Sequence, residues 1–333
     1  MINTALVITS IANDHHPVLL QYAHEARLHS VSFIVIGDTK SPSTFNLPGC
    51  DFYSIARQES LGLTITQKLP KKHYARKNIG YLVAARQGAE VIIETDDDNI
   101  PLPSFWEHRS RGQNSHLLHD TGWTNAYKYF TDVHIWPRGF ALEEILKVVP
   151  SLPKNLASVS SPIQQGLADD NPDVDALYRL TLTLPIVFNK ASHIALAQNA
   201  ICPFNSQNTT WFKEAFPLLY LPSYCSFRMT DIWRSFVAQR IAWSCGWPIL
   251  FHQSTVRQER NAHNLMNDFK DEIVGYTNNF QLMNALINLK LVDGVDNIAQ
   301  NMVTCYQALI QMGLIDNLEM PLLLAWLHDL NQN

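Results

Sequence analysis

The chain has 333 residues, of which 46% are apolar and 17% are charged, and its net charge is −5 at neutral pH. This composition excludes a disordered or fibrous chain, and without a long basic run it argues against nucleic-acid binding. The five cysteines lack a Cys-x-x-Cys spacing, which indicates free thiols in a reducing compartment. No run approaches the roughly 18 apolar residues of a membrane helix, so we expect neither a signal peptide nor a membrane span.

The chain opens with an alternation of apolar runs and an amphipathic segment. Residues 5–11 and 31–38 read as buried strands, residues 15–29 as a helix between them, and residues 50–54 as a short third strand. A strand–helix–strand opening predicts a parallel sheet with right-handed connections.

Residues 71–85 predict the next helix, with apolar residues at 79, 82, 83 and 85. The start of this segment is basic, and cations there oppose the helix dipole. We therefore expect these cations to face an anion such as a nucleotide diphosphate. The alternative is a solvated basic helix end.

Three consecutive carboxylates, Asp96, Asp97 and Asp98, follow the apolar run 91–93. Neighbouring carboxylates repel each other unless a cation lies among them, and Mg²⁺ and Mn²⁺ prefer oxygen ligands. Because open α/β sheets bind ligands at the carboxyl ends of their strands, this pattern predicts a metal–diphosphate site there. The alternative is a solvated acidic turn.

The rest of the chain continues this mixed pattern up to about residue 275. Residues 157–163, 184–188 and 248–252 read as strands, residues 226–245 as a helix, and residues 102–130 as an irregular connection over a cleft. Beyond residue 276 amphipathic stripes predict helices only, so we expect a main domain at 1–275 and a helical appendix at 276–333. The stripes would pack on the main domain or on another copy, which makes a homo-oligomer an expected partner.

Several motifs together resemble a known family. The segments 76–82, 92–98, 203–209 and 226–234 resemble the STELLO glycosyltransferases and, more distantly, the reversibly glycosylated polypeptides, which include UDP-arabinopyranose mutases. The resemblance covers roughly residues 5–265. It implies a GT-A fold, in which a Rossmann-like sheet binds a nucleotide sugar, here a UDP-sugar, through Mn²⁺ or Mg²⁺, and transfers the sugar to a glycan or other acceptor.

The resemblance also assigns roles to individual residues. Asp96, Asp98 and His252 match metal ligands, and Asp231 matches the catalytic carboxylate of inverting members. The nucleotide-sugar contacts would be Thr9, Gly37, Asp38, Arg76, Lys77, Asp97, Asn205, Gln207 and Arg228. Several of them have a structural alternative: Asp38 could end a strand, Asp231 could cap a helix, the amides could satisfy a loop, and His252 could lie at a sheet edge.

Three functions remain open on the sequence. The first is a metal-dependent glycosyltransferase. The second is a nucleotide-sugar mutase, since Arg138 lies near the position of the Arg-Gly stretch that the mutase group uses for self-glycosylation. The third is a catalytically silent partner in a polysaccharide-assembly complex. The chain lacks the N-terminal membrane anchor of STELLO proteins, which predicts a soluble cytoplasmic protein.

Overall fold

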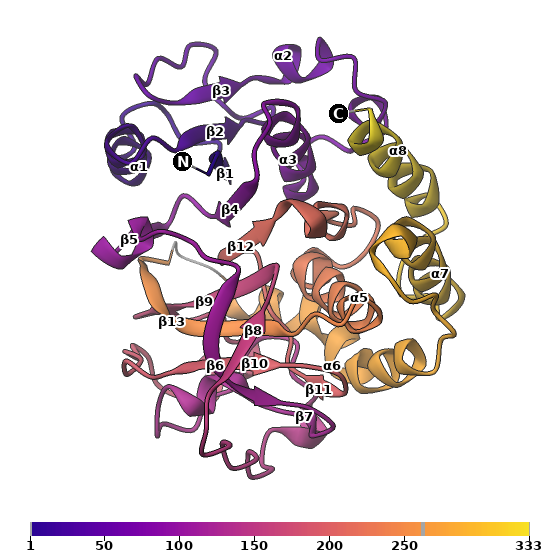
Figure 1. The fold of residues 1–333 in the computed structure, drawn as a ribbon. Coiled ribbons are helices and arrows are strands. Elements are labelled where there is room, and N and C mark those ends of the chain that lie inside the picture. The colour runs from indigo at the N-terminus through magenta and orange to yellow at the C-terminus, as the bar shows by residue number, and fades with distance from the viewer. Residues whose placement is uncertain (1, 261–263, 333) are drawn as a thin grey trace.

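The computed structural model describes residues 2–260 and 264–332 as an α/β protein with one large mixed sheet (Figure 1). The strands are β1 (Thr4–Thr9), β2 (Ser32–Ile36), β3 (Asp51–Tyr53), β4 (Val91–Thr95), β5 (Asn99–Pro101), β6 (Gly112–Leu118), β7 (Gly122–Trp123), β8 (Ala157–Ser160), β9 (Ile163–Asp169), β10 (His193–Leu196), β11 (Ala200–Ile201), β12 (Asn208–Phe212) and β13 (Ile249–Gln258). The α-helices are α1 (Pro17–Leu28), α2 (Ile55–Glu59), α3 (Lys77–Arg86), α4 (Ala176–Thr181), α5 (Thr230–Ser244), α6 (Leu265–Ile287), α7 (Ile298–Gln311) and α8 (Glu319–Asn331).

The N-terminal half of the sheet is parallel and has the order β3-β2-β1-β4. These strands are short apolar runs, and their central residues, such as Val7, Ile34 and Ile92, are fully buried because helices and connections cover both faces. The strand order is that of the first half of a doubly wound nucleotide-binding fold. The predicted Rossmann-like α/β architecture is therefore confirmed.

The second half of the sheet is mixed. Next to β4 lies the antiparallel strand β12, followed by β9, β13, β10, β6 and β8. Strand β13 runs for ten residues, six of them beyond the predicted end at 252, and its far end pairs with β5. This pairing brings the end of β13 beside the segment that carries the acidic triplet.

Two expectations for this half are wrong. Residues 184–188 do not form a strand: Ile186 makes a single bridge with Asp170, and Pro185 has no N–H group for a ladder. The expected irregular connection at 102–130 contains a seven-residue strand, β6, which pairs with β8 and β10.

The C-terminal helices α6–α8 stack along one side of the sheet, and the C-terminus lies near α2 and α3 (Figure 1). Their apolar stripes pack on the main body, as predicted: the residues that join the same core as α3 and α5 include Leu282, Leu286, Ile298, Met302, Cys305 and Leu309. The predicted boundary at 275/276 falls inside α6, which begins at Leu265.

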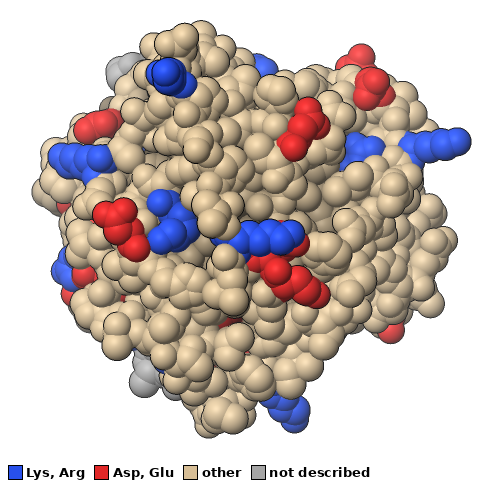
Figure 2. Space-filling model, turned by 90° about the horizontal axis from the view of Figure 1, so that it is seen from below, with Lys and Arg blue, Asp and Glu red and all other residues tan. Residues whose placement is uncertain are grey.

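No described helix is both long and apolar enough to cross a membrane. On the face drawn in Figure 2, acidic and basic side chains are interspersed rather than segregated.

Candidate functional site

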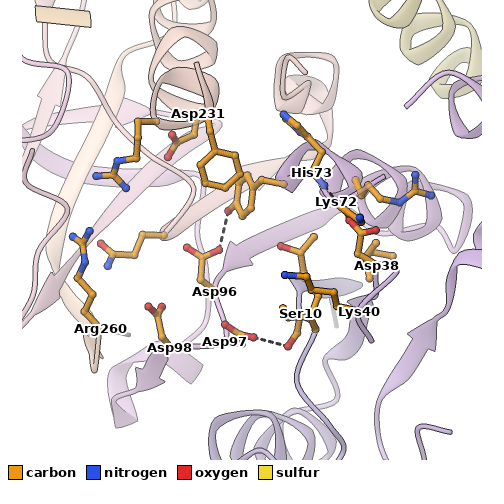
Figure 3. A pocket seen from close by; sticks show the side chains of 18 of the residues that line it. Ser10, Asp38, Lys40, Lys72, His73, Asp96, Asp97, Asp98, Asp231 and Arg260 are labelled. Atoms are coloured by element: carbon orange, nitrogen blue, oxygen red, sulfur yellow. Dashed lines mark hydrogen bonds between the residues drawn. The ribbon is translucent and has the colours of Figure 1, made fainter. Parts of the chain in front are cut away.

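A cavity of about 470 Å³ opens at the carboxyl ends of β1, β2 and β4, between the two halves of the sheet. Most of the predicted site residues line it, namely Thr9, Gly37, Asp38, Arg76, Asp96, Asp97, Asp98, Gln207, Arg228 and Asp231. Segments far apart in the sequence therefore meet where the fold rule for α/β sheets places a ligand. In Figure 3 the acidic triplet lies between Asp38, Lys40, Lys72 and His73 on one side and Asp231 and Arg260 on the other.

Asp96 is held by two side chains from the start of the α3 region. The Lys77 ammonium lies 2.9 Å from Asp96 Oδ1, and the Tyr74 hydroxyl donates to the same oxygen at 2.8 Å. Lys77 also donates to the Thr95 carbonyl at 2.6 Å. Burial raises the pKa of Asp96, although Lys77 opposes this effect.

The other two carboxylates have different partners. Ser10 donates to Asp97 Oδ2 at 2.5 Å, and Gln258 Nε2 donates to Asp98 Oδ2 at 3.1 Å. Asp98 Oδ1 is buried and has no hydrogen-bond partner among the residues that the structure describes. Burial, followed by the charge of Asp96, raises the pKa of Asp98 to about 7. An unpartnered carboxylate oxygen in such a place is suited to a cation.

These residues fit a Mg²⁺ or Mn²⁺ ion that is bound jointly with a ligand. Within residues 2–260 and 264–332, no three His, Cys, Asp or Glu side chains form a complete metal site. These ions, however, commonly use only one or two protein carboxylates and take further oxygens from substrate phosphates. Asp96 and Asp98 supply that number.

Arg76 and Lys77, which were predicted to face a bound anion, instead make their hydrogen bonds to other groups of the protein. Arg76 is 1% exposed and donates to Gln58 Oε1 through Nε at 2.9 Å and Nη2 at 2.5 Å. Arg76 still reaches the cavity wall, whereas the Lys77 side chain is fully buried behind Asp96. The exposed cations that line the Asp38 end of the cavity are Lys40, which was not predicted, and Lys72, which belongs to the basic start of the predicted helix segment 71–85.

The end of β2 is shaped by close packing. A Cβ on Gly37 would lie 2.7 Å from the Phe52 ring and 2.8 Å from Ser41 Oγ, so only glycine fits without a shift. The next residue, Asp38, accepts the backbone N–H groups of Thr39 at 2.6 Å and His73 at 3.0 Å. Asp38 thus joins the strand end to the segment that precedes α3.

Asp231 forms an ion-pair cluster at the other end of the cavity. Arg138 donates to both oxygens of Asp231, at 3.0 and 2.8 Å, and to both oxygens of Asp173, at 2.8 and 2.9 Å. Burial would raise the pKa of Asp231, but Arg138 outweighs it and lowers this pKa to about 2. Burial likewise opposes the charge of Arg138, yet its two carboxylates hold its pKa well above the usual value.

Of the predicted residues Asn205, Gln207 and Arg228, the last two line the cavity and Asn205 does not. Gln207 lines the cavity, whereas Asn205 is buried behind it and accepts the Gln207 N–H at 3.0 Å. Arg228 lines the cavity and is paired with Glu272 of α6 at 2.7 Å. The structural alternative for Asn205, a loop amide that satisfies backbone groups, is therefore the one realised.

His252 does not join the acidic triplet. It lies in the middle of β13, where its Nδ1 contacts the Gln253 carbonyl at 2.9 Å and its ring lies 6.1 Å from the ring of His193. The strand continues six residues further, and Gln258 takes the place next to Asp98 that was expected for His252. Burial, followed by the charge of Arg109, lowers the pKa of His252 to about 3.

A hydrogen-bonded link between the two ends of the cavity was not predicted. The Tyr74 hydroxyl lies 2.7 Å from Ser206 Oγ, which in turn lies 3.2 Å from Asp231 Oδ2. The two hydroxyl groups therefore lie in line between Asp96 and Asp231, and their two protons can serve two of the three contacts in this line at a time. Tyr74 lies in the predicted helix segment 71–85 and Ser206 in the motif 203–209, but neither carries a charge that would have marked it.

Comparison with known proteins gives a consistent relationship. A model of the family "STELLO glycosyltransferases" matches residues 228–333. Two Arabidopsis thaliana proteins are similar over most of the chain. "Probable glycosyltransferase STELLO2" is 27% identical over 89% of this chain and 41% of that protein. "Probable glycosyltransferase STELLO1" is 29% identical over 68% of this chain and 32% of that protein.

The chain thus spans less than half the length of these curated relatives. A mycobacterial protein of known crystal structure aligns over 95% of this chain and 76% of that one, with 10% identity and a TM-score of 0.43. The family match includes the C-terminal helices, which the motifs had left out. Together, these matches confirm that the chain is similar to the STELLO glycosyltransferases and extend the similarity beyond residue 265.

Proposed function

We propose that the protein is a metal-dependent glycosyltransferase that uses a UDP-sugar as donor and a glycan or other hydroxyl compound as acceptor. The observation that carries the proposal is the unpartnered, buried Oδ1 of Asp98, which lies beside Asp96 in the wall of a cavity of about 470 Å³. Desolvated carboxylates that face a cavity are destabilised until a cation joins them.

The nucleoside would bind at the Rossmann-like end. Thr9, Gly37 and Asp38 line this end, and the carboxylate of Asp38 can accept hydrogen bonds from ribose hydroxyl groups. The exposed side chains of Lys40 and Lys72 lie on the same side of the acidic triplet, where they would attract an anionic ligand (Figure 3).

Asp96 and Asp98 would hold Mn²⁺ or Mg²⁺. Such an ion, when bound, supplies positive charge to the diphosphate that leaves the sugar. Gln258 donates to the second oxygen of Asp98, which would leave Oδ1 for the ion. Asp97 is fixed by Ser10 and shapes the rim of the same site.

Asp231 is the proposed acceptor of the proton from the attacking hydroxyl group. Its lowered pKa keeps it ionised throughout the neutral range, and Arg138 and Ser206 fix both of its oxygens. Arg138 itself is a cation enclosed by two carboxylates, so its geometry gives no support to a nucleophilic role as in self-glycosylation. A cytoplasmic location and association through the C-terminal helices stay predictions.

The test is UDP binding by calorimetry with and without Mn²⁺. The parent should bind UDP at least tenfold more tightly with Mn²⁺, and Asp98→Asn and Asp96→Asn should lose that gain. Asp98→Asn should keep the melting temperature of the parent, whereas Asp96→Asn should fold with a lower one, because it leaves the buried charge of Lys77 without its carboxylate. Asp120→Asn, which changes an exposed carboxylate outside the cavity, is the matched control. Unchanged Mn²⁺-dependent binding in both triplet variants would refute the metal site.

A further inference from the structure

Four arginine side chains line the end of the cavity remote from Gly37 and Asp38. They come from four separate segments, and they are Arg138, Arg179, Arg228 and Arg260. Bringing like charges together in a partly desolvated place is costly unless anions balance them. The balance among these arginines is uneven, as their partners show.

Three of the four have carboxylate partners within the protein. Arg138 pairs with Asp173 and Asp231, Arg228 with Glu272 at 2.7 Å, and Arg260 with Asp268 at 2.7 Å. These ion pairs are short, and Glu272 and Asp268, the partners of Arg228 and Arg260, both lie in α6. The charges of these three arginines are thus compensated by the fold itself.

Arg179 differs because both hydrogen bonds that it makes to residues described by the structure go to uncharged acceptors. Its Nη1 donates to Asn171 Oδ1 at 3.3 Å, and its Nη2 donates to the Pro172 carbonyl at 2.9 Å. Its Nε is buried and has no partner among the residues that the structure describes. Burial and then the charge of Arg260 lower the pKa of Arg179 to about 9, so its charged form is destabilised where it lies.

We propose that Arg179, with Arg260 beside it, binds the carboxylate or phosphate group of an acidic sugar at this end of the cavity. A guanidinium group presents a planar fork that matches the oxygens of either anion, and the Nε of Arg179 is a donor to which no described residue offers an acceptor. Neutral sugars lack the charge that this position requires.

The location indicates which part of the reaction this anion belongs to. In Figure 3, Arg260 and Asp231 lie across the acidic triplet from Asp38 and Lys72. With the nucleoside at the Asp38 end and the diphosphate at the triplet, the arginine end faces the transferred sugar and the acceptor. The inference therefore rests on the proposed function and names the class of sugar that it handles.

The acidic group can come from two sources, a uronic acid in the donor or a phosphorylated sugar as acceptor. Calorimetry distinguishes them with five probes and Mn²⁺ present: UDP, UDP-glucose and UDP-glucuronate, and then glucose and glucose 6-phosphate, each added to the UDP complex. A donor source predicts that UDP-glucuronate binds at least tenfold more tightly than UDP-glucose, and an acceptor source predicts that glucose 6-phosphate binds where glucose does not.

Arg179→Gln should remove the preference for the acidic probe by about tenfold or more and leave UDP binding unchanged. Arg179→Lys keeps the positive charge but lacks the planar guanidinium group, so it should keep part of the preference for the acidic probe. Arg240→Gln is the matched control, because Arg240 also donates to backbone carbonyls, those of Leu286 and Leu289, but lies outside this cavity.

The inference is overturned if the parent binds neither acidic probe better than its neutral counterpart, or if Arg179→Gln keeps the preference. Failure of the proposed function gives a different result, namely no Mn²⁺-dependent UDP binding at all. In that case glucose 6-phosphate and glucose are compared on the parent and Arg179→Gln without UDP. Equal binding of the two sugars would then overturn the inference on its own.

Discussion

The ammonium group of Lys77 lies 2.9 Å from Asp96 Oδ1, and no part of the lysine side chain is exposed. The first carboxylate of the acidic triplet therefore has a resident cation in the folded protein. A buried pair of this kind is costly to break from one side, because the remaining charge is left without compensation.

Lys77→Met should lower the free energy of unfolding by about 2–4 kcal/mol in the absence of metal, since Asp96 then loses its counter-charge. Mn²⁺ should recover part of that loss, so that its stabilising effect is larger in the variant than in the parent. Denaturant unfolding with and without Mn²⁺ measures both effects. The double variant Lys77→Met/Asp96→Asn should be more stable than Lys77→Met alone, and a purely additive loss would contradict the pairing.

Asp231→Asn should lower turnover by roughly 10²–10⁴-fold and leave Mn²⁺-dependent UDP binding within about twofold, because it removes the proton acceptor but not the donor site. Transfer kinetics with glucose 6-phosphate and with glucose as acceptors, together with UDP calorimetry, provide the measurement. Asp173→Asn is the control, since Asp173 binds the same Arg138. An equal loss in both variants would assign Asp231 a positioning role through Arg138 instead.

Gly80 marks the closest approach of α3 to the sheet. A Cβ there would lie 2.5 Å from Val7 Cγ1 and 2.9 Å from Ile36 Cγ1. Gly80→Ala should therefore destabilise the protein by about 1–2 kcal/mol, because overpacking outweighs the higher helix propensity of alanine. Chemical unfolding of this variant and of Gly80→Ala/Val7→Ala checks the cause. If Val7→Ala does not recover stability in the Gly80→Ala background, the contact with Val7 is not the cause of the destabilisation.

His252 should make the protein less stable in mild acid. Its pKa is lowered from 6.5 to about 3 on folding, so between these values the unfolded chain binds more protons than the folded one. The associated stability is complete above pH 6.5 and falls as the pH drops toward 3. Relative to pH 7.5, we expect a loss at pH 5 of about 1–2 kcal/mol that His252→Gln does not show. Parallel pH dependences of unfolding in parent and variant would exclude this contribution.

The sequence predicted the parts of the molecule that local patterns determine. The apolar runs of the sequence predicted the buried strands β1, β2 and β4, and they placed the acidic triplet at the end of β4. Because ligands bind at the carboxyl ends of parallel strands, the cavity could be located from the sequence. The strand β12 was missed because its residues, from Asn208 to Phe212, include polar side chains that are satisfied only inside the folded sheet. The β propensity of a residue does not include hydrogen bonds that polar side chains make only in the folded protein.

The roles of individual charges were harder to predict for the same reason. The basic start of α3 predicted a bound anion, but within the protein Lys77 donates to Asp96 and Arg76 donates to Gln58. The length of β13 decided between His252 and Gln258 as neighbour of Asp98, and strand ends are the least certain feature of a sequence pattern. Arg179 belongs to no motif that could have marked it; what distinguishes it is that its hydrogen bonds to the described residues reach no carboxylate.

Helix α8 ties together two segments that are far apart in the chain. Through carboxylates near its two ends, Glu319 and Asp329, it accepts four backbone N–H groups, at 2.7–2.9 Å. The donors are Thr64, Ile65, Ser223 and Tyr224. Detachment of this one helix would release all four amides together. Their deuterium exchange should therefore proceed with one common opening free energy, which makes segments on opposite halves of the sheet a single cooperative unit of local unfolding.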